Sequence, residues 1–518
     1  MAGVGPSDLG PSDLGAAGQP ATVGTWIGFV AMAVGMFMAI LDIQIVASSL
    51  PEIQAGLGIT TDLTSWVQTA YLMAEVVAIP LTGFLTRCLS TRGLFVAAVA
   101  GFTAASLGCA LSRGFVSLVV CRVIQGFCGG AIIPCVFAAV FLLFPQRLHD
   151  RATVIAGVLA MLAPTLGPTL GGWITERLSW HWLFLINLPP GIVVGALVGA
   201  LIAIDRPDWR QLRRIDSASL ALIAVFLATL ELVLKQAPAL GWLSPRALAM
   251  LVLCLGAGAG AGWRCLTRAE PIVDLRAFAE RDFALGCCLS FALGMGLYGA
   301  VYLMPLFLGY IRQHSPLEIG AVMAVTGGAQ LVAAPLATMA EKRYDRRCLA
   351  ALGYGLLAIG LSLSGFATYA TDFDAMFWPQ VVRGASLMLC ILPVTTIALG
   401  RLPAERLANA SGLFNLMRNL GGAIGLALID TVLEQRPPVH ADHIVARLME
   451  GDPDAARFVG LATDRFKGVP LGPIDQATRE FVQPLVERAA AVASFNDAWL
   501  LLAILVGLSL VAVPLFRR

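Results

Sequence analysis

An ionisable side chain lies late in the first long apolar run of the chain. Residues 41–51, LDIQIVASSLP, place the carboxylate of Asp42 where a membrane span would be surrounded by hydrocarbon. Such a charge costs roughly 2.5 to 3.5 kcal/mol on insertion scales, so it normally faces a cavity or a charged partner. Asp42 is therefore the first candidate for a group that exchanges protons or binds a cation. The alternative is a carboxylate that only hydrogen-bonds to neighbouring helices.

A second carboxylate, Glu75, lies in the middle of the second apolar run. Gln68 and Tyr71 precede it at spacings that put all three side chains on one face of a helix. This pattern predicts a polar stripe that faces a lumen. We interpret Glu75 as a second proton-coupling candidate and Gln68 and Tyr71 as substrate-binding candidates.

An arginine in the fourth apolar run is a candidate partner for Asp42. Arg122 lies roughly 10 Å from the end of its run at 1.5 Å per residue, and Asp42 lies at a similar depth in its own run. A contact between the two side chains is geometrically allowed, and we expect Arg122 to take part in proton coupling. The alternative is a clamp from Arg122 to backbone carbonyl groups.

Other polar and aromatic side chains within apolar runs are candidates to contact a substrate. Tyr298 could stack on an aromatic substrate, although aromatic residues at helical spacing more often pack in a core. Asp430, near the end of a later run, is expected to face solvent. The remaining substrate-binding candidates are Gln125, Arg383, Asn415 and Arg418.

The composition identifies the kind of protein that must position these residues. Of 518 residues, 58% are hydrophobic and 13% are charged, and the mean hydropathy is +0.80, whereas a soluble domain carries roughly 25% charged residues. The sequence therefore predicts an all-α polytopic membrane protein. Fourteen apolar runs approach the length of about 20 residues that a spanning helix needs. They lie at 25–48, 65–86, 94–112, 115–144, 152–175, 182–204, 216–234, 246–263, 283–308, 317–340, 348–366, 376–400, 409–432 and 494–515.

The distribution of basic residues predicts the orientation. Of the 35 lysines and arginines, 20 lie in alternate loops and at the C-terminus, and only four lie in the short loops on the other side. The positive-inside rule then places both termini in the cytoplasm. Residues 1–23 are expected to form a disordered cytoplasmic tail, and the long segment 433–493 is expected outside, as short amphipathic helices on the membrane or against a partner.

An internal repeat predicts two halves. At a constant offset of 255 residues, Arg92 falls on Arg347 and Gly167 on Gly422, and residues 80–94 align with residues 335–349. We therefore expect a six-helix half at 24–204, two inserted helices at 205–264 and a second six-helix half at 265–518. Parallel halves that rock about a midplane site are a known transporter plan.

Two further stretches predict close helix packing and a bend. In GFLTRCLSTRG (83–93), Arg87 and Arg92 are expected to meet the C-terminal dipoles of neighbouring helices. In GVLAMLAPTLGPTLGG (157–172), two prolines remove backbone donors and should kink the helix, while glycines permit close packing. The gating candidates in this second stretch are Pro164, Gly167, Pro168, Gly171 and Gly172.

These stretches, with RVIQGFCGGAIIP (122–134) and WHWLFLINLPPG (180–191), carry a resemblance over nearly the whole chain. The sequence resembles the major facilitator superfamily, and within it the fourteen-span drug:proton antiporters of the EmrB/QacA group. It departs from the wider pattern at Arg87, where aspartate is usual, and at Ser90, where glycine is usual. The resemblance implies proton-coupled efflux of amphipathic compounds across the bacterial inner membrane by alternating access. It also implies a periplasmic adaptor of the EmrA kind and a TolC-type outer-membrane channel as partners.

Two other functions stay open at this point. The same fold could export one endogenous fatty acid, lipid or metabolite, since Arg122, Arg383 and Arg418 suit an anion. A non-transporting membrane assembly or sensor protein is the third hypothesis. No nucleophile elbow, phosphate loop or metal-binding cluster occurs in the sequence, so we expect no enzyme activity, no cofactor, no metal and no nucleic-acid partner.

Overall fold

Long helices make up the protein. The computed structural model describes residues 22–203, 207–208, 210, 216–268, 271–400, 402–463, 468 and 476–516, so the expected tail lies almost entirely outside the described residues. Within them, thirteen helices are long and apolar enough to cross a membrane, and a helix pair bent by 45° between residues 164 and 166 makes up a fourteenth span. The prediction of an all-α polytopic membrane protein is confirmed.

The first half is a bundle of six spans whose short connecting helices cap its ends. Helix α1 packs against α6 and α8, and α5 packs against α3 and α4. The spans are α1 (Val23–Ser48), α3 (Thr61–Leu89), α4 (Thr91–Ala110), α5 (Phe115–Leu143), α6 (His149–Arg177) and α8 (Leu188–Leu201), and the short elements are α2 (Leu50–Leu57), η1 (Gln146–Leu148) and α7 (Trp182–Leu185).

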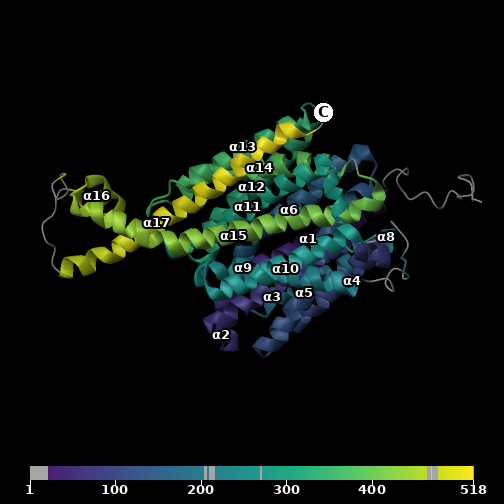
Figure 1. Cartoon of the computed structure of the whole chain (residues 1–518), viewed down its shortest axis with the longest axis horizontal. Coiled ribbons are helices and arrows are strands. Elements are labelled where there is room, and N and C mark those ends of the chain that lie inside the picture. The colour runs from purple at the N-terminus through teal and green to yellow at the C-terminus, as the bar shows by residue number, and fades with distance from the viewer. Residues whose placement is uncertain are drawn as a thin grey trace, which may run out of the picture.

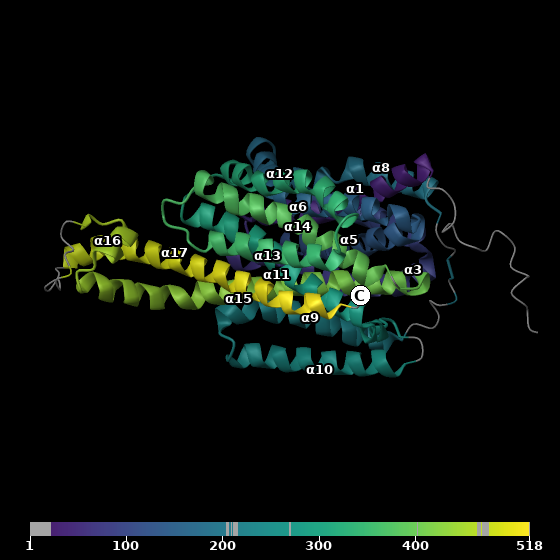
Figure 2. The ribbon, with the colours of Figure 1, turned by 90° about the horizontal axis from the view of Figure 1, so that it is seen from above.

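The second half repeats this arrangement, and two inserted helices flank the molecule. Figure 2 shows α9 and α10 side by side along one edge, with α10 outermost. Helix α9 packs against both α3 and α15, so it contacts both halves, whereas α10 packs mainly on α9. The bounds are α9 (Ser217–Leu240), α10 (Pro245–Thr267), η3 (Leu275–Ala279), α11 (Arg281–Tyr310), α12 (Pro316–Glu341), α13 (Arg346–Ser364), α14 (Phe373–Leu399), α15 (Ala404–Met449), α16 (Pro453–Val459), α17 (Gln476–Leu508) and η5 (Ser509–Leu515).

Equivalent positions of the repeat make equivalent contacts. Arg92 donates a hydrogen bond to the carbonyl of Ile202 at the end of α8 (3.4 Å), and Arg347 donates one to the carbonyl of Phe516 at the end of η5 (3.1 Å). Both arginines therefore meet the C-terminal carbonyl groups of the last span in their own half, as the helix dipole favours. This prediction for Arg92 is confirmed.

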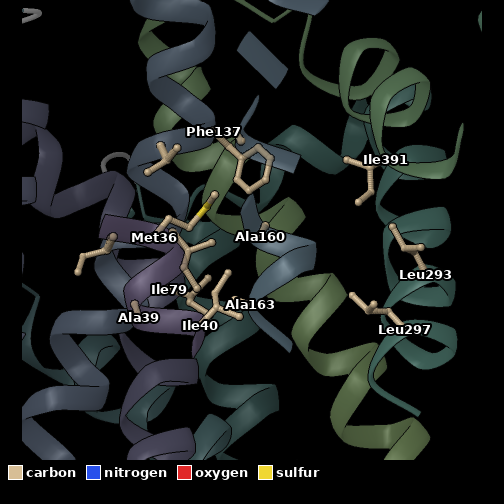
Figure 3. Packing of buried hydrophobic residues seen from close by; sticks show 14 of the residues in the cluster. Met36, Ala39, Ile40, Ile79, Phe137, Ala160, Ala163, Leu293, Leu297 and Ile391 are labelled. Atoms are coloured by element: carbon tan, nitrogen blue, oxygen red, sulfur yellow. The ribbon is translucent and has the colours of Figure 1, made fainter. Parts of the chain in front are cut away.

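The two halves meet along a continuous apolar interface. Figure 3 shows buried side chains of α1, α3, α5 and α6 on one side of it, with those of α11 and α14 on the other. The labelled side chains are Met36, Ala39, Ile40, Ile79, Phe137, Ala160, Ala163, Leu293, Leu297 and Ile391. The Oγ of Ser411 donates a hydrogen bond to the carbonyl of Pro134 across this interface (3.0 Å).

The segment 433–493 differs from its expected form. Helix α15 continues to Met449 through Pro437 and Pro438, and its 46 residues span about 70 Å at 1.5 Å per residue, more than twice the hydrocarbon thickness of about 30 Å. Figure 1 shows α15 and α17 projecting side by side beyond the bundle, with α16 at their tip. We call this projection the arm, the bundle end from which it projects the arm end, and the opposite end, where α1 begins, the terminal end.

The arm forms because its apolar residues have each other to pack against. Ile444 and Leu448 of α15 share a small buried cluster with Val459 of α16 and with Val486 and Ala490 of α17. The apolar residues that suggested helices lying on the membrane therefore pack against one another inside the arm. The prediction of short separate helices for its described part is wrong.

Candidate functional site

Asp42 forms a buried ion pair within the first half. The Nη1 of Arg122 on α5 donates a hydrogen bond to Oδ2 of Asp42 on α1 at 2.5 Å, and both side chains are fully buried. The Nε of Arg122 also donates to the carbonyl of Val67 (3.1 Å). The predicted contact is present, and the alternative clamp to a backbone carbonyl occurs alongside it.

Amide and hydroxyl groups complete this network. Gln125 and Asn187 both donate to Oδ1 of Asp42, at 3.0 and 2.7 Å, and Gln125 also donates to the hydroxyl of Ser106 (2.8 Å). A buried charge is retained in apolar surroundings when such hydrogen bonds accompany its partner. Sequence reasoning missed Asn187 and Ser106, although Asn187 stands out as an amide within the stretch WHWLFLINLPPG.

The aromatic ring of Tyr71 on α3 packs against the guanidinium of Arg122. The guanidinium Cζ of Arg122 lies 4.3 Å from the centroid of the Tyr71 ring, and the Tyr71 hydroxyl donates to the carbonyl of Ala39 (3.3 Å). Tyr71 and Gln125, predicted to bind substrate, are thus part of the ion-pair network. Neither chamber of the central cavity, described next, has Asp42, Tyr71, Arg122 or Gln125 in its lining.

A central cavity lies between the halves. A chamber of about 100 Å³ is lined by Gln68, Glu75 and Tyr298 among mainly apolar side chains. A second chamber of about 280 Å³ shares Gln68 and Tyr298 and extends along α11 to Pro305. The structure thus brings together one proton-coupling candidate and two substrate-binding candidates, on α3 and α11.

An acidic residue of the inserted helix also lines this cavity. Glu231 of α9 lies on its wall with Glu75 of α3, and the two carboxylates are close enough to interact electrostatically. Sequence reasoning missed Glu231, although its signal is as clear as that of Asp42. In the apolar run 217–240, Glu231 and Lys235 are the two charged residues.

A second group of charges lies one turn further along α9. Lys235 donates a hydrogen bond to the hydroxyl of Thr69 on α3 and interacts electrostatically with Asp430 on α15. Asp430 in turn accepts a hydrogen bond from the hydroxyl of Tyr302 on α11 (2.7 Å). Asp430 is therefore engaged within the protein and only partly exposed, which corrects the expectation that it faces solvent.

The remaining arginine candidates lie apart from the central cavity. Arg383 of α14 lines a separate pocket of about 20 Å³, stacks over Trp499 at 4.9 Å, and its Nη1 is buried without a hydrogen-bond partner in the described chain. Arg418 donates to Oδ1 of Asn415 and lies 5.2 Å from the Phe137 ring of the first half. The structure therefore does not gather the predicted arginines into one site.

Charged side chains connect the halves at the terminal end. Arg346 of α13 pairs with Glu341 at 3.1 Å and with Asp150 of α6 at 3.6 Å. These three residues line a cavity of about 580 Å³. Arg87, expected to meet the C-terminal dipole of a neighbouring helix, lies in the last turn of α3 over the Phe84 ring (5.9 Å) and, among the described residues, donates no hydrogen bond to this cluster.

The proline- and glycine-rich stretch of α6 bends the helix and fits it closely to its neighbours. The 45° bend follows Pro164, and Pro168 lines the central cavity. A Cβ at Gly167 would lie 2.2 Å from the Cβ of Gln44 on α1, so only glycine permits this approach. Gly171 and Gly172 are also buried, and their carbonyl groups accept hydrogen bonds from the next turn of the helix.

Comparison with known proteins gives the same fold. Residues 32–426 match the family model of the Major Facilitator Superfamily. The chain is 38% identical to the colistin resistance protein EmrB of Acinetobacter baumannii over 93% of this chain and 94% of that protein. It is 29% identical to the multidrug export protein EmrB of Escherichia coli K12 over 94% and 95% of the two chains. It is also 30% identical to the fatty acid resistance protein FarB of Neisseria gonorrhoeae, over 82% and 85%.

The family model covers more than half of the chain, and the first of these relatives aligns along nearly all of it. The two six-helix halves, the two inserted helices and the cavity between the halves agree with that assignment. The chain belongs to the major facilitator superfamily, in the group of EmrB-type multidrug transporters.

Proposed function

We propose that this protein is a proton-coupled multidrug efflux transporter that exports amphipathic compounds across the bacterial inner membrane by alternating access. The observation that carries the proposal is the central cavity, whose mainly apolar wall holds Gln68, Glu75 and Tyr298 at the boundary between the halves. Such a cavity suits a ligand that is apolar over most of its surface and polar at a few points. Similarity to a protein named for multidrug export, along nearly the whole chain, supports the same function.

The proton-coupling residues in this proposal are Asp42, Glu75 and Arg122. Glu75 meets the substrate cavity directly, so protonation and substrate binding can compete at that side chain. Asp42 acts through its ion pair: a proton on its carboxyl group weakens the bond to Arg122 and frees α1 and α5 to shift relative to each other. Tyr71 and Gln125 then have positioning roles around Arg122.

The substrate-binding residues in this proposal are Gln68 and Tyr298, because both line both chambers of the cavity. Arg418 of α15 lies against Phe137 of the first half and donates to Asn415 of the same helix, and a movement between the halves would expose both residues. Arg383 is assigned to its separate small pocket. The bent stretch from Pro164 to Gly172 is the hinge of α6 in this scheme.

The membrane and partner assignments are part of the proposal. Basic loops at the terminal end support a cytoplasmic location for both termini, which puts the arm in the periplasm. The arm supports docking of a periplasmic adaptor of the EmrA kind, which would join a TolC-type channel. Capture of such an adaptor by the intact protein, and its loss when residues 433–493 are replaced, is the expected result; unchanged capture would contradict this part.

Transport in proteoliposomes tests the function. An imposed pH gradient should drive accumulation of an amphipathic dye in wild-type vesicles and should fail to do so in Asp42→Asn. Glu75→Gln should lose the dependence on the gradient. Transport that is indifferent to the gradient, or equal in Asp42→Asn and wild type, would overturn proton coupling.

One observation favours a second function, the export of a specific endogenous fatty acid, lipid or metabolite. The buried Nη1 of Arg383 has no hydrogen-bond partner in the described chain, which suits an anionic group, and one relative is named for fatty acid resistance. A susceptibility panel distinguishes the two functions. Deletion of a multidrug exporter sensitises cells to chemically diverse compounds, whereas deletion of a dedicated exporter changes susceptibility narrowly or not at all.

A further inference from the structure

Two carboxylates from different parts of the chain lie on the wall of one apolar cavity. Glu75 belongs to α3 of the first half and is only 3% exposed, and Glu231 belongs to the inserted helix α9. Within the described residues, neither carboxylate accepts a hydrogen bond from the protein, although both line the same chamber. Buried polar groups in proteins are almost always paired, so this arrangement indicates a ligand.

Two amides on the same wall share this property. Gln44 and Gln68 line both chambers of the cavity, and in the described chain neither side chain makes a hydrogen bond to the protein. They therefore remain free to bind a ligand beside the carboxylates. The contrast with Asp42 is clear, because that carboxylate is fully engaged by protein donors.

The charged groups around the pair leave it negative. Arg122 of α5 interacts with Glu75, but its ion pair is with Asp42. Lys235 interacts with Glu231 from the next turn of α9, but it also donates a hydrogen bond to Thr69 and interacts with Asp430. The phenol of Tyr298 faces the pair from α11, and no basic side chain lines this chamber among the described residues.

We propose that Glu75 and Glu231 form one site for a single positive charge, occupied in turn by a proton on one of the two carboxyl groups and by the cationic group of an amphipathic substrate. Two negative charges in a cavity of low dielectric constant repel each other strongly, so the pair holds one proton when no other cation is present. Binding of an organic cation releases that proton to solvent, and release of the cation allows a proton to return. The inserted helix α9 is thus part of the transport site.

This inference rests on the proposed export function and names the substrate class of its central site. It is tested on the full chain, purified in lipid nanodiscs, with tetraphenylphosphonium as a probe because this cation carries no exchangeable proton. Calorimetry between pH 6 and 8.5 should show that wild type binds the probe more tightly as pH rises and releases about one proton per cation bound. Glu231→Gln and Glu75→Gln should each weaken binding about tenfold or more at pH 8, the effect of losing a charge-assisted contact, and should abolish proton release.

Matched variants separate a site from a folding defect. Glu231→Asp keeps the charge and should restore most of the binding, and Glu52→Gln, an exposed acid on α2, should bind like wild type. Equal probe affinity and equal proton release in Glu231→Gln and wild type would overturn the site. Gradient-driven transport of an uncharged amphipathic dye, measured in wild type and in Glu231→Gln, tells this failure from a failure of the export function, because that transport stays intact in both if only the cation site is wrong.

Discussion

The guanidinium of Arg122 lies 2.5 Å from the carboxylate of Asp42, and both side chains are completely buried inside the first half. Among the ion pairs of the described residues, this pair is the most deeply buried. It joins α1 to α5, and helices α2, α3 and α4 lie between these two in the sequence. Removing one partner of such a pair leaves an uncompensated charge in an apolar interior.

Arg122→Met should therefore lower the stability of the protein by about 3 to 5 kcal/mol. The double variant Asp42→Asn with Arg122→Met should recover part of this loss, because no charge then remains unpaired. Thermal unfolding in detergent, followed by tryptophan fluorescence, measures both. A double variant no more stable than Arg122→Met would contradict the assignment of the loss to the unpaired carboxylate.

A close approach between the halves at the arm end predicts a block of transport. A Cβ at Gly320 of α12 would lie 1.9 Å from Oγ1 of Thr169 on α6, whereas a Cβ at Gly328 of the same helix meets no atom within 4 Å. Gly320→Val should prevent the two halves from closing against each other at the arm end and should reduce dye efflux severalfold. Gly328→Val is the matched control and should transport like wild type; equal loss in both variants would point to general damage to α12.

The ion pairs of Arg346 predict a shift between conformations. This side chain joins Asp150 of the first half to the second half and is 43% exposed, so each contact contributes about 0.2 to 1 kcal/mol. Arg346→Ala should increase the population with separated terminal ends about two- to fivefold. Spin labels at Arg147 and Tyr344, both exposed, report that population as a longer distance.

The control for this shift is Arg457→Ala, which removes an exposed ion pair within α16 of the arm and should leave the distance distribution unchanged. A distribution that stays the same in Arg346→Ala would exclude the proposed contribution of this residue to closure of the terminal end.

An ion pair between two loops at the arm end predicts that the stability of the protein depends on pH. The hydrogen bond from Arg312, at 2.6 Å, holds the pKa of Asp372 below its usual value, which is about 3.9 in an unfolded chain. Because the folded value is the lower one, this carboxylate stabilises the fold above about pH 4, and the contribution disappears as pH falls through the folded value.

Asp372→Asn should accordingly reduce stability by about 0.5 to 1 kcal/mol at pH 7, a small value because both side chains are partly exposed. The difference from wild type should shrink when unfolding is measured at progressively lower pH. Asp442→Asn, an exposed position on the arm, should show no such trend. A difference that is constant between pH 7 and pH 3 would exclude ionisation of Asp372 as its cause.

Several features of this protein follow from local properties of the sequence. The apolar runs fixed the spans, since the length and hydropathy of a run decide whether a helix can cross a membrane. The repeat aligned Arg92 with Arg347, and the structure gives these two residues equivalent contacts. Equal depth in two runs was sufficient to predict that Asp42 and Arg122 could meet.

Tertiary structure decided which of these charges meets the cavity. Asp42 faces its own half, whereas Glu75 and Glu231 face the chamber between the halves, because the rotation of each helix is set by the neighbours it packs against. The arm was decided in the same way: Ile444 and Val486 lie far apart in sequence, and only their packing together distinguishes a projecting pair of helices from two that lie on a membrane. The sequence by itself therefore determined the helices and the kinds of charged group they carry, while long-range packing determined where those groups point.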